Sequence, residues 1–323
     1  VIYWFDMYEI KQPSQIIIGR DSSKNFNFPE NSLIITSSGT VKRRWLEHLG
    51  IKNYSLFDNV EPNPSLDTAN HIIETFSTKN ISCVIGLGGG SSLDVAKYVG
   101  RNIKKKKIMI PTTFGSGSEV TRISVLTVNG KKQSFHDDSL FADTSIIDSF
   151  FIQNSPPEII KNSAIDAVAQ CSEGFDSLNG NYYTKFLCEH AFNLLENGIL
   201  NMNKENIVLG SLVSGLGFGN CSTTLGHALS YVYSNEGYSH GHALAYTTLI
   251  AHKYNNSKFY KRFKELVTYF SFPKINLSTE LEICAETIFQ DKKHLNNNPK
   301  IISKENIIDL LKIINITDLS TKN

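Results

Sequence analysis

CVIGLGGGSSLDVAKYV, residues 83–99, is the stretch that decides the fold of this chain. A short apolar run opens it, a cluster of glycines follows, and a helical pattern closes it. This order of strand, glycines and helix brings backbone N–H groups up to a phosphate in parallel-sheet proteins. Glycine is needed there because a Cβ would block the approach. The spacing is not G-x-G-x-x-G, so a plain tight turn remains the alternative interpretation.

Composition limits the class of protein. The chain has 323 residues, of which 41% are hydrophobic and 20% charged, and its net charge is +1. Such a chain is long enough for two globular domains, and its balanced charge argues against binding to nucleic acid or a membrane surface. The five cysteines form no C-x-x-C pair, which indicates reduced thiols. With no signal-peptide pattern and no run long enough to span a bilayer, we expect a cytoplasmic protein.

Short β-branched runs alternate with helical patterns in the first half of the chain. We expect strands at 16–18, 33–35, 81–85, 108–110 and 146–147, and helices at 38–49 and 66–78. Residues 124–135, with Asn129-Gly130 at the centre, are typical of a β-hairpin. Alternating strands and helices predict a mainly parallel sheet covered on both faces. Residues 1–150 are therefore predicted to form an α/β domain.

The pattern becomes helical from Pro156 onward. Helical periodicity covers residues 156–178, 182–198, 204–217, 222–235, 241–255, 258–270, 279–290 and 304–314. No strand signal interrupts these segments, so residues 151–323 are predicted to form an all-helical domain. We expect the polar tail 320–323 to fray.

Polar groups recur where an all-helical core would exclude them. Asp166 and Gln170 are four residues apart and share a helix face, and His227, His240 and His242 follow in apolar surroundings. Imidazole together with a carboxylate oxygen suits Fe(II), Zn(II) or a similar ion. Such an ion would act on a substrate oxygen as a Lewis acid. Histidines satisfied within the core are the alternative.

The helix face of Asp166 also carries Ser163 and Glu173. Four polar residues on one face are equally typical of a solvated stripe, and the periodicity does not separate that interpretation from a ligand set. Both interpretations stay open at this point.

Several motifs together resemble the iron-containing (group III) alcohol dehydrogenases, with the related glycerol dehydrogenases and dehydroquinate synthases. They are GGGSSLDVAK, PTTFGSGSEVT, the Lys132 region, AIDAVAQ, the GHALSY–HGHALA pair and NNPKIISKENI. The resemblance implies an α/β nucleotide-binding domain and an all-α metal-binding domain, with the active site in the cleft between them.

The resemblance also implies which residues bind the cofactor and the metal. The cofactor residues would be Gly88, Gly89, Gly90, Ser91, Asp94, Thr112, Thr113, Ser116 and Lys132. The metal ligands would be Asp166, His227 and His240, with Gln170 at the position where the family has a fourth ligand, histidine. A histidine often found near the nicotinamide is replaced here by Tyr231. The D-A-x-x-Q, HALSY and HGHA combination is most similar to the phosphonoacetaldehyde reductase branch.

Cofactor choice depends on the turn after the strand at 33–35. NAD-selective enzymes often place a carboxylate against the ribose 2′-hydroxyl, whereas this turn reads Thr36-Ser37-Ser38-Gly39-Thr40 and precedes three basic residues. Ser37 and its neighbours could therefore receive the 2′-phosphate of NADP(H). An ordinary helix start with exposed cations is the alternative, and NAD(H) stays open.

These features predict a metal-dependent oxidoreductase that reduces an aldehyde to a primary alcohol with NAD(P)H. Its catalytic residues would be Asp166, His227, His240 and Tyr231, its metal Fe2+ or, second, Zn2+, and its substrate a small aldehyde such as phosphonoacetaldehyde. A lyase resembling dehydroquinate synthase, using NAD transiently, is one alternative. A non-catalytic binding protein on a decayed enzyme scaffold is another, because the family histidine is Gln170 here. A homodimer is one expected assembly.

Overall fold

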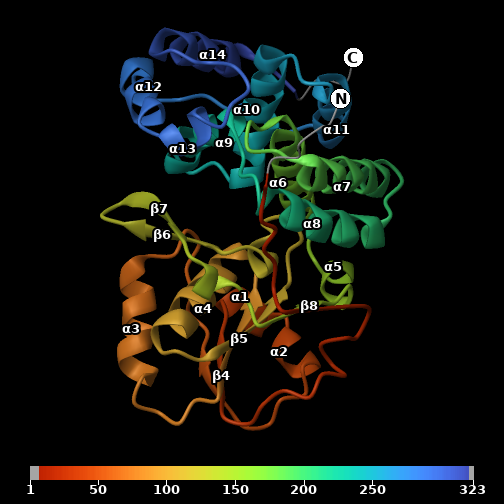
Figure 1. The fold of residues 1–323 in the computed structure, drawn as a ribbon, viewed down its shortest axis with the longest axis vertical. Coiled ribbons are helices and arrows are strands. Elements are labelled where there is room, and N and C mark those ends of the chain that lie inside the picture. The colour runs from red at the N-terminus through yellow and green to blue at the C-terminus, as the bar shows by residue number, and fades with distance from the viewer. Residues whose placement is uncertain (1–6, 320–323) are drawn as a thin grey trace.

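The computed structural model describes residues 7–319 and has an α/β part and a helical part, stacked one on the other (Figure 1). In the α/β part six parallel strands form one sheet in the order β1-β8-β5-β4-β2-β3. The strands are β1 (Gln15–Ile18), β2 (Ser32–Ile35), β3 (Tyr54–Phe57), β4 (Cys83–Gly88), β5 (Lys106–Pro111) and β8 (Thr144–Ile147). The predicted mainly parallel sheet is confirmed.

The strand order reverses direction between β2 and β4. From β2 the chain continues outward to β3, and from β4 it continues the other way to β5. In parallel sheets a crevice opens beyond the carboxyl ends of the strands at such a switch point, and ligands bind there. The glycine cluster follows β4 and the Ser37 turn follows β2, so the topology brings these two segments to one crevice.

Both faces of the sheet are covered, as expected for parallel strands. Leu33 and Val84 pack on the side of helices α3 (Leu66–Phe76) and α4 (Gly90–Asn102). Ile34 on the opposite face belongs to the same core cluster as residues of the short helices α2 (Trp45–His48) and α5 (Phe150–Gln153). Another short helix, α1 (Ser38–Lys42), follows β2.

The predicted hairpin is confirmed as β6 (Ile123–Val128) paired with β7 (Lys131–His136). Asn129 and Gly130 have φ of 49° and 75°, which are the left-handed values that a two-residue hairpin turn requires. In Figure 1 the hairpin lies at the left, at the height where the α/β part and the helical part adjoin.

Two predictions in the α/β part were wrong. The single helix at 38–49 is broken into α1 and α2, because Arg44 between them takes a left-handed φ of 59°. Strand β3 was not predicted, since only four residues form it and its side chains are half-exposed at the sheet edge. An edge strand of this kind lacks the continuous apolar run that identifies a buried strand.

The helical part confirms each predicted helix within a few residues. Its members are α6 (Pro157–Asp176), α7 (Tyr182–Leu200), α8 (Lys204–Phe218), α9 (Leu225–Asn235), α10 (His240–Asn255), α11 (Tyr260–Phe270), α12 (Leu281–Phe289), α13 (Lys292–Leu295) and α14 (Lys304–Ile316). Two 3-10 turns, η1 (Ser118–Val120) and η2 (Asp138–Leu140), lie in the α/β part. The four-residue helix α13 was not predicted. The tail 320–323, expected to fray, lies outside the described residues, and the domain boundary at 150/151 stays a prediction.

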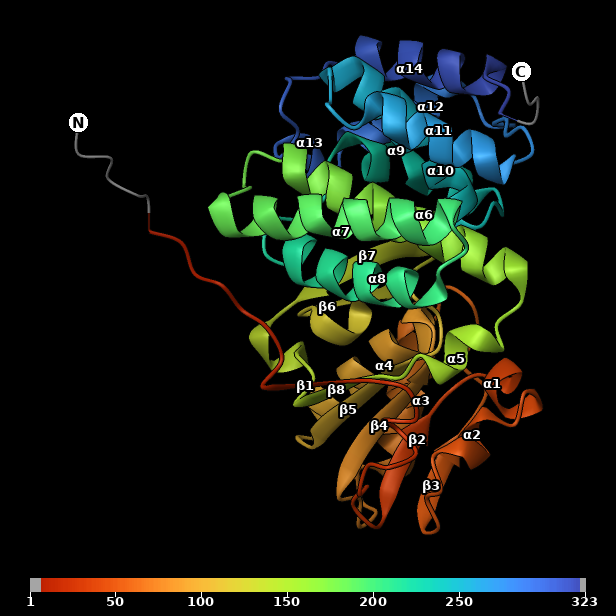
Figure 2. The ribbon, with the colours of Figure 1, turned by 90° about the vertical axis from the view of Figure 1, so that its right-hand side faces the viewer.

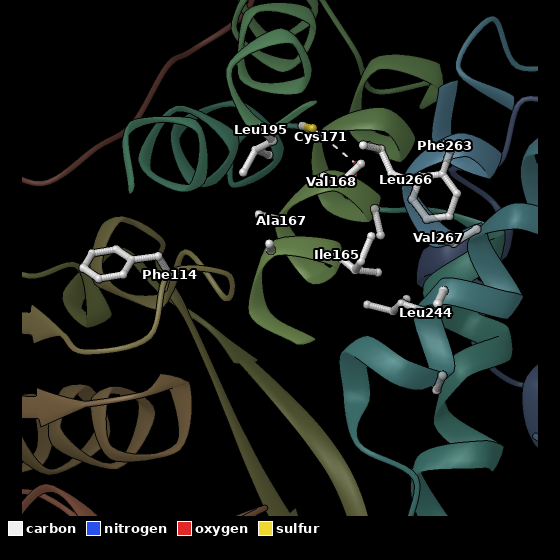
Figure 3. Close-up of a cluster of buried hydrophobic side chains, with 14 of the residues drawn as sticks. Phe114, Ile165, Ala167, Val168, Cys171, Leu195, Leu244, Phe263, Leu266 and Val267 are labelled. Atoms are coloured by element: carbon white, nitrogen blue, oxygen red, sulfur yellow. Dashed lines mark hydrogen bonds between the residues drawn. The ribbon is translucent and has the colours of Figure 1, made fainter. Parts of the chain in front are cut away.

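Helix α6 is the centre of the helical core. Its apolar side chains, among them Ile165 and Val168, are buried, and side chains from α7, α10 and α11 surround them (Figure 3). Figure 2, turned by 90°, shows α7 and α8 lying side by side over the sheet of the α/β part. Within residues 7–319, no helix is both long and apolar enough to cross a membrane. Because neighbouring helices pack around α6, this core sets the position of the polar residues on the same helix.

Candidate functional site

A cavity of about 330 Å³ lies between the two parts of the molecule. The start of α4 and the hairpin line one side of it, and α6, α9, α10 and α13 line the other. Among the lining residues are Gly90, Ser91, Thr113, Ser116, Lys132, Asp166, Gln170, His227, Tyr231 and His240. The structure therefore brings most of the predicted site residues to one cavity, as the resemblance implied.

Asp166, His227 and His240 meet at one point although they come from three helices. The Asp166 Oδ1 atom lies 3.8 Å from Nε2 of His227 and 3.8 Å from Nε2 of His240. One ligand atom from each of the three lies within 4.8 Å of the others. Two imidazole nitrogens and a carboxylate oxygen at this spacing match the donor set of a divalent transition metal.

Gln170 belongs to the same cluster. Its Nε2 donates a hydrogen bond to Asp166 Oδ1 at 2.9 Å, while its Oε1 is buried and has no partner among the described residues. A buried amide oxygen without a partner is costly, and a cation would relieve that cost. Rotating the amide by 180° would direct Oε1 toward the position between the three ligand atoms. The donor set therefore fits a metal ion.

Glu173 holds His227 in place. Its Oε2 accepts from Nδ1 of His227 at 2.8 Å and from the backbone N–H of Thr224 at 2.9 Å. The bond at Nδ1 turns Nε2 toward Asp166 and fixes which nitrogen stays free, as carboxylates behind metal-binding histidines do. Burial alone would lower the pKa of His227, but the charge of Glu173 and hydrogen bonds with Asp166 and Glu173 raise it to about 9.

The solvated-stripe interpretation of the α6 face is wrong for these residues. Asp166, Gln170 and Glu173 are 8%, 5% and 1% exposed, because α9 and α10 pack over them. The role of Glu173 was missed in the sequence, where it differed in no way from a surface glutamate. The only signal was its position seven residues after Asp166, which places both on one face of the helix.

The two histidines of the HGHA motif, His240 and His242, have different partners. His240 reaches Asp166, and burial lowers its pKa to about 4, so the ring is neutral and can offer a lone pair. His242 binds the backbone carbonyl of Pro273 through Nε2 at 2.5 Å and stacks near Phe272, away from the cluster. Only the first histidine of the motif lies at the site.

The glycine cluster after β4 makes a cradle without side chains. Gly88 has φ of 155°, and a Cβ there would lie 2.7 Å from Ser92 Oγ. A Cβ on Gly89 would lie 3.0 Å from Thr113 Oγ1, so the two turns that line the cavity approach each other closely. Helix α4 begins at Gly90, and its free N–H groups face this cradle, as at phosphate sites.

Of the remaining predicted cofactor residues, some line the cavity and others support the glycine turn from behind. Thr112 is buried and donates its backbone N–H to Gly88 O at 2.9 Å, so it supports the glycine turn. Asp94 lines the cavity, but its carboxylate accepts from Ser118 Oγ at 2.5 Å and from the Val125 backbone N–H at 3.0 Å. These bonds tie α4 to the hairpin. Lys132 lines the cavity from β7.

Ser37 lies on the turn after β2, beside the cradle rather than in the cavity lining. Its Oγ is 3.4 Å from Oγ1 of Thr40, whose hydroxyl in turn lies 3.8 Å from the Cβ position of Gly88. No acidic residue lies in the first turn of α1.

Tyr231 and His294 also line the cavity, and His294 was not predicted from the sequence. The Tyr231 ring lies 5.8 Å from that of His294, and burial raises the pKa of its phenol, so the hydroxyl keeps its proton. His294 in α13 also stacks 6.4 Å from His227 and binds Asp291 Oδ2 through Nδ1 at 2.6 Å. No periodic signal marked α13, so the sequence did not reveal His294.

Two sequence profiles match the chain. The profile of iron-containing alcohol dehydrogenases matches residues 13–149, and the C-terminal profile of the Fe-containing alcohol dehydrogenase family matches residues 160–280. One covers the nucleotide side of the cavity and the other the metal side. The chain belongs to the iron-containing alcohol dehydrogenase family.

Named relatives are similar over parts of the chain. The 4-hydroxybutyrate dehydrogenase of Clostridium kluyveri is 31% identical over 137 residues, which is 38% of this chain and 37% of that protein. The sulfoacetaldehyde reductase of Bilophila wadsworthia is 26% identical over 242 residues, 59% of this chain and 61% of that protein. The matches thus span less than two thirds of either relative.

Solved structures share the fold over nearly the whole chain. The sulfoacetaldehyde reductase of Bifidobacterium kashiwanohense, solved in complex with NAD+, superposes with a TM-score of 0.87 at 22% identity and covers 97% of this chain and 100% of its own. A 1,3-propanediol oxidoreductase superposes with a TM-score of 0.88 at 19% identity, covering 96% and 100%. These likenesses show the fold of an α/β domain joined to a helical domain.

Proposed function

We propose that this protein is a metal-dependent aldehyde reductase that uses NAD(P)H and produces a primary alcohol. The observation that carries the proposal is the single cavity with Asp166, His227 and His240 on one wall and the glycine cradle on the other. Family membership supports the same reaction class. Hydride transfer needs a nucleotide and a carbonyl group held side by side, and a cavity lined by both the glycine turn and the Asp166 cluster supports such an arrangement.

In this reaction the residues of the helical wall would have separate roles. Asp166, Gln170, His227 and His240 would hold a divalent ion, Fe2+ in the first place and Zn2+ in the second. When bound, that ion supplies Lewis-acid polarisation of the aldehyde oxygen, and the nicotinamide supplies the hydride. Glu173 keeps the His227 ring oriented. Tyr231 keeps a donor hydroxyl beside the site, one route for the proton that the new alcohol requires.

The nucleotide would lie across the cavity with its pyrophosphate on Gly88–Ser91. Thr113, Ser116 and Lys132 would line it toward the metal residues. The absence of an acid beside Ser37 favours NADP(H), while the relative of known structure named above was solved with NAD+. Titration of the protein with both nucleotides decides between NADP(H) and NAD(H).

The aldehyde is proposed only by class. Phosphonoacetaldehyde was expected from the D-A-x-x-Q, HALSY and HGHA combination, whereas the relatives reported above are named for sulfoacetaldehyde and 4-hydroxybutyrate. The names of these relatives do not support a phosphonate-bearing aldehyde over one that bears a sulfonate or a carboxylate. All three compounds carry an anionic group on a short chain.

Two alternatives are separable from this proposal. A lyase resembling dehydroquinate synthase would show no net oxidation of NADPH, and a decayed scaffold would bind neither metal nor nucleotide. The intact cluster, and the Gln170 oxygen for which residues 7–319 supply no hydrogen-bond partner, favour a metal-binding protein over a decayed one.

The test is a rate assay of the metal-loaded protein. Protein loaded with Fe(II) under argon, or with Zn(II), should oxidise NAD(P)H when sulfoacetaldehyde, phosphonoacetaldehyde, 4-oxobutanoate or butanal is added, and should yield the matching alcohol. Absence of oxidation with every aldehyde, from protein that holds stoichiometric metal, would refute the proposed function.

Cofactor preference is expected to depend on Ser37. The parent protein should bind NADPH more tightly than NADH, and Ser37→Asp should reverse the order by roughly tenfold or more, because a carboxylate repels the 2′-phosphate and accepts from a 2′-hydroxyl. Nucleotide fluorescence titration measures both constants. Ser77→Asp, which adds the same charge at the exposed end of α3, should change neither. Equal affinities of the parent protein for the two nucleotides would contradict the prediction.

Metal affinity is expected to depend on Gln170. Gln170→His should strengthen metal binding, because imidazole is the better donor for Fe(II) or Zn(II), while the rate stays equal or falls. The amide, as a weaker donor, leaves the ion more electron-poor. A chelator titration beside a rate assay measures both effects. Gln153→His, at an exposed position at the end of α5, is the control for an added histidine. Unchanged affinity in the Gln170 variant would show that this side chain is not a ligand.

A further inference from the structure

Two lysines line the cavity without an acidic partner. Among the described residues, neither Lys132 on β7 nor Lys293 on α13 forms an ion pair with a carboxylate. The two carboxylates in the cavity wall, Asp94 and Asp166, already lie against donor groups of the protein. Asp166 attracts Lys132 and Asp291 attracts Lys293, but neither carboxylate lies within ion-pair distance, so an anionic ligand would give each ammonium group a direct partner.

Lys293 is held at the rim by a neutral partner. Its Nζ donates to Nε2 of His136 at 2.7 Å, which links α13 to β7. Burial, and then the charge of Lys293, lower the pKa of His136 to about 4, so that ring accepts the bond without adding charge of its own. An ammonium group has three donors, and two of them remain for a ligand.

Lys293 comes from α13 on the helical wall of the cavity, and its ammonium group reaches across to His136 of the hairpin. The next residue, His294, has its ring 5.8 Å from Tyr231 and 6.4 Å from His227. The glycine cradle forms the other wall, so the nucleotide phosphates already have a place of their own. A short molecule whose carbonyl oxygen points to the Asp166 cluster would extend its far end toward Lys293.

We propose that Lys293 binds an anionic group at the far end of the aldehyde and thereby selects sulfonate-, phosphonate- or carboxylate-bearing substrates over neutral ones. The inference rests on the proposed function and names its substrate class. An ammonium group is a compact point charge without the fixed fork of arginine, so it suits each of these three anions. His136 acts as a positioning residue, because its hydrogen bond fixes where the Lys293 ammonium lies.

The test replaces Lys293 and compares charged with neutral substrates. In Lys293→Met, kcat/KM should fall about 10- to 100-fold for sulfoacetaldehyde and 4-oxobutanoate, and stay within about twofold for butanal, because only the anions lose a charge-assisted bond. Lys293→Arg, which keeps the cation, should recover most of the loss. Lys292→Met is the matched control, since Lys292 is exposed and lies over the Phe289 ring, 3.4 Å from its centroid.

Binding without turnover gives a second readout. Calorimetric titration with 2-hydroxyethanesulfonate should show affinity weakened by the same factor in Lys293→Met and unchanged in Lys292→Met. Equal losses for butanal and sulfoacetaldehyde, or a change confined to the KM of NAD(P)H, would overturn the inference and leave the aldehyde reductase proposal standing. If no aldehyde is reduced, the proposed function fails, and the titration alone still decides whether Lys293 binds the anion.

Discussion

Asp166→Ala and His227→Ala should each leave the purified protein without metal. Three ligand atoms from these residues and His240 lie within 4.8 Å of one another, and the fourth position is an amide, which is a weak donor. Losing one strong donor from such a set leaves too few to hold the ion. Metal content by elemental analysis should fall to background, and the rate of aldehyde reduction should drop by roughly a thousandfold or more.

His242→Ala is the matched control for these two variants. Its ring lies on the same helix as His240 but binds the Pro273 carbonyl instead of the cluster, so metal content should stay stoichiometric. Circular dichroism should show that all three variants remain folded. Stoichiometric metal in both Asp166→Ala and His227→Ala would mean that this ligand set is wrong.

Glu173→Gln should weaken metal binding by about 10- to 100-fold, the range seen when a carboxylate behind a ligand histidine is removed. Glu173 is 1% exposed and accepts from Nδ1 of His227 at 2.8 Å, so its charge makes Nε2 a better donor and fixes the ring. In the metal-free protein the same change should lower the pKa of His227 from about 9, since the charge of Glu173 is one of the influences that raise it. NMR titration of the imidazole measures this.

Glu158→Gln provides the comparison for Glu173. Glu158 lies in the first turn of the same helix, eight residues before Asp166, and its side chain is 78% exposed, so neither metal affinity nor the His227 pKa should change. A Glu173 variant that binds metal as tightly as the parent protein would show that the hydrogen bond to His227 is structural only.

Local sequence was sufficient for the elements with a strong period or a strong turn signal. The helices of the second half, the Asn129-Gly130 hairpin and the strand before the glycines all depend on neighbours a few residues apart. It was insufficient at Arg44, where the chain breaks a helical pattern with a left-handed residue, and at β3, which forms only because the edge of β2 offers backbone partners.

Some residues of the candidate site could likewise be predicted from local sequence, and others could not. Asp166 and Gln170 share a face because of helix geometry alone, and the glycines after β4 mark the cradle because few other residues allow that backbone. By contrast, Glu173 became recognisable only once the fold had placed it against His227, 54 residues away. Lys293 and His294 come from a four-residue helix that carries no periodic signal.

The sequence by itself determined that this protein has a parallel α/β part with a glycine turn between a strand and a helix, a helical part that contains Asp166, His227 and His240, and the motifs of its family. Short-range geometry encodes such features, because strand alternation, helix period and glycine backbone freedom act between near neighbours. Only the tertiary structure decided which polar residues are buried together and which charges face the cavity. Those properties depend on packing between helices far apart in the chain, where burial converts an ordinary glutamate or lysine into part of a site.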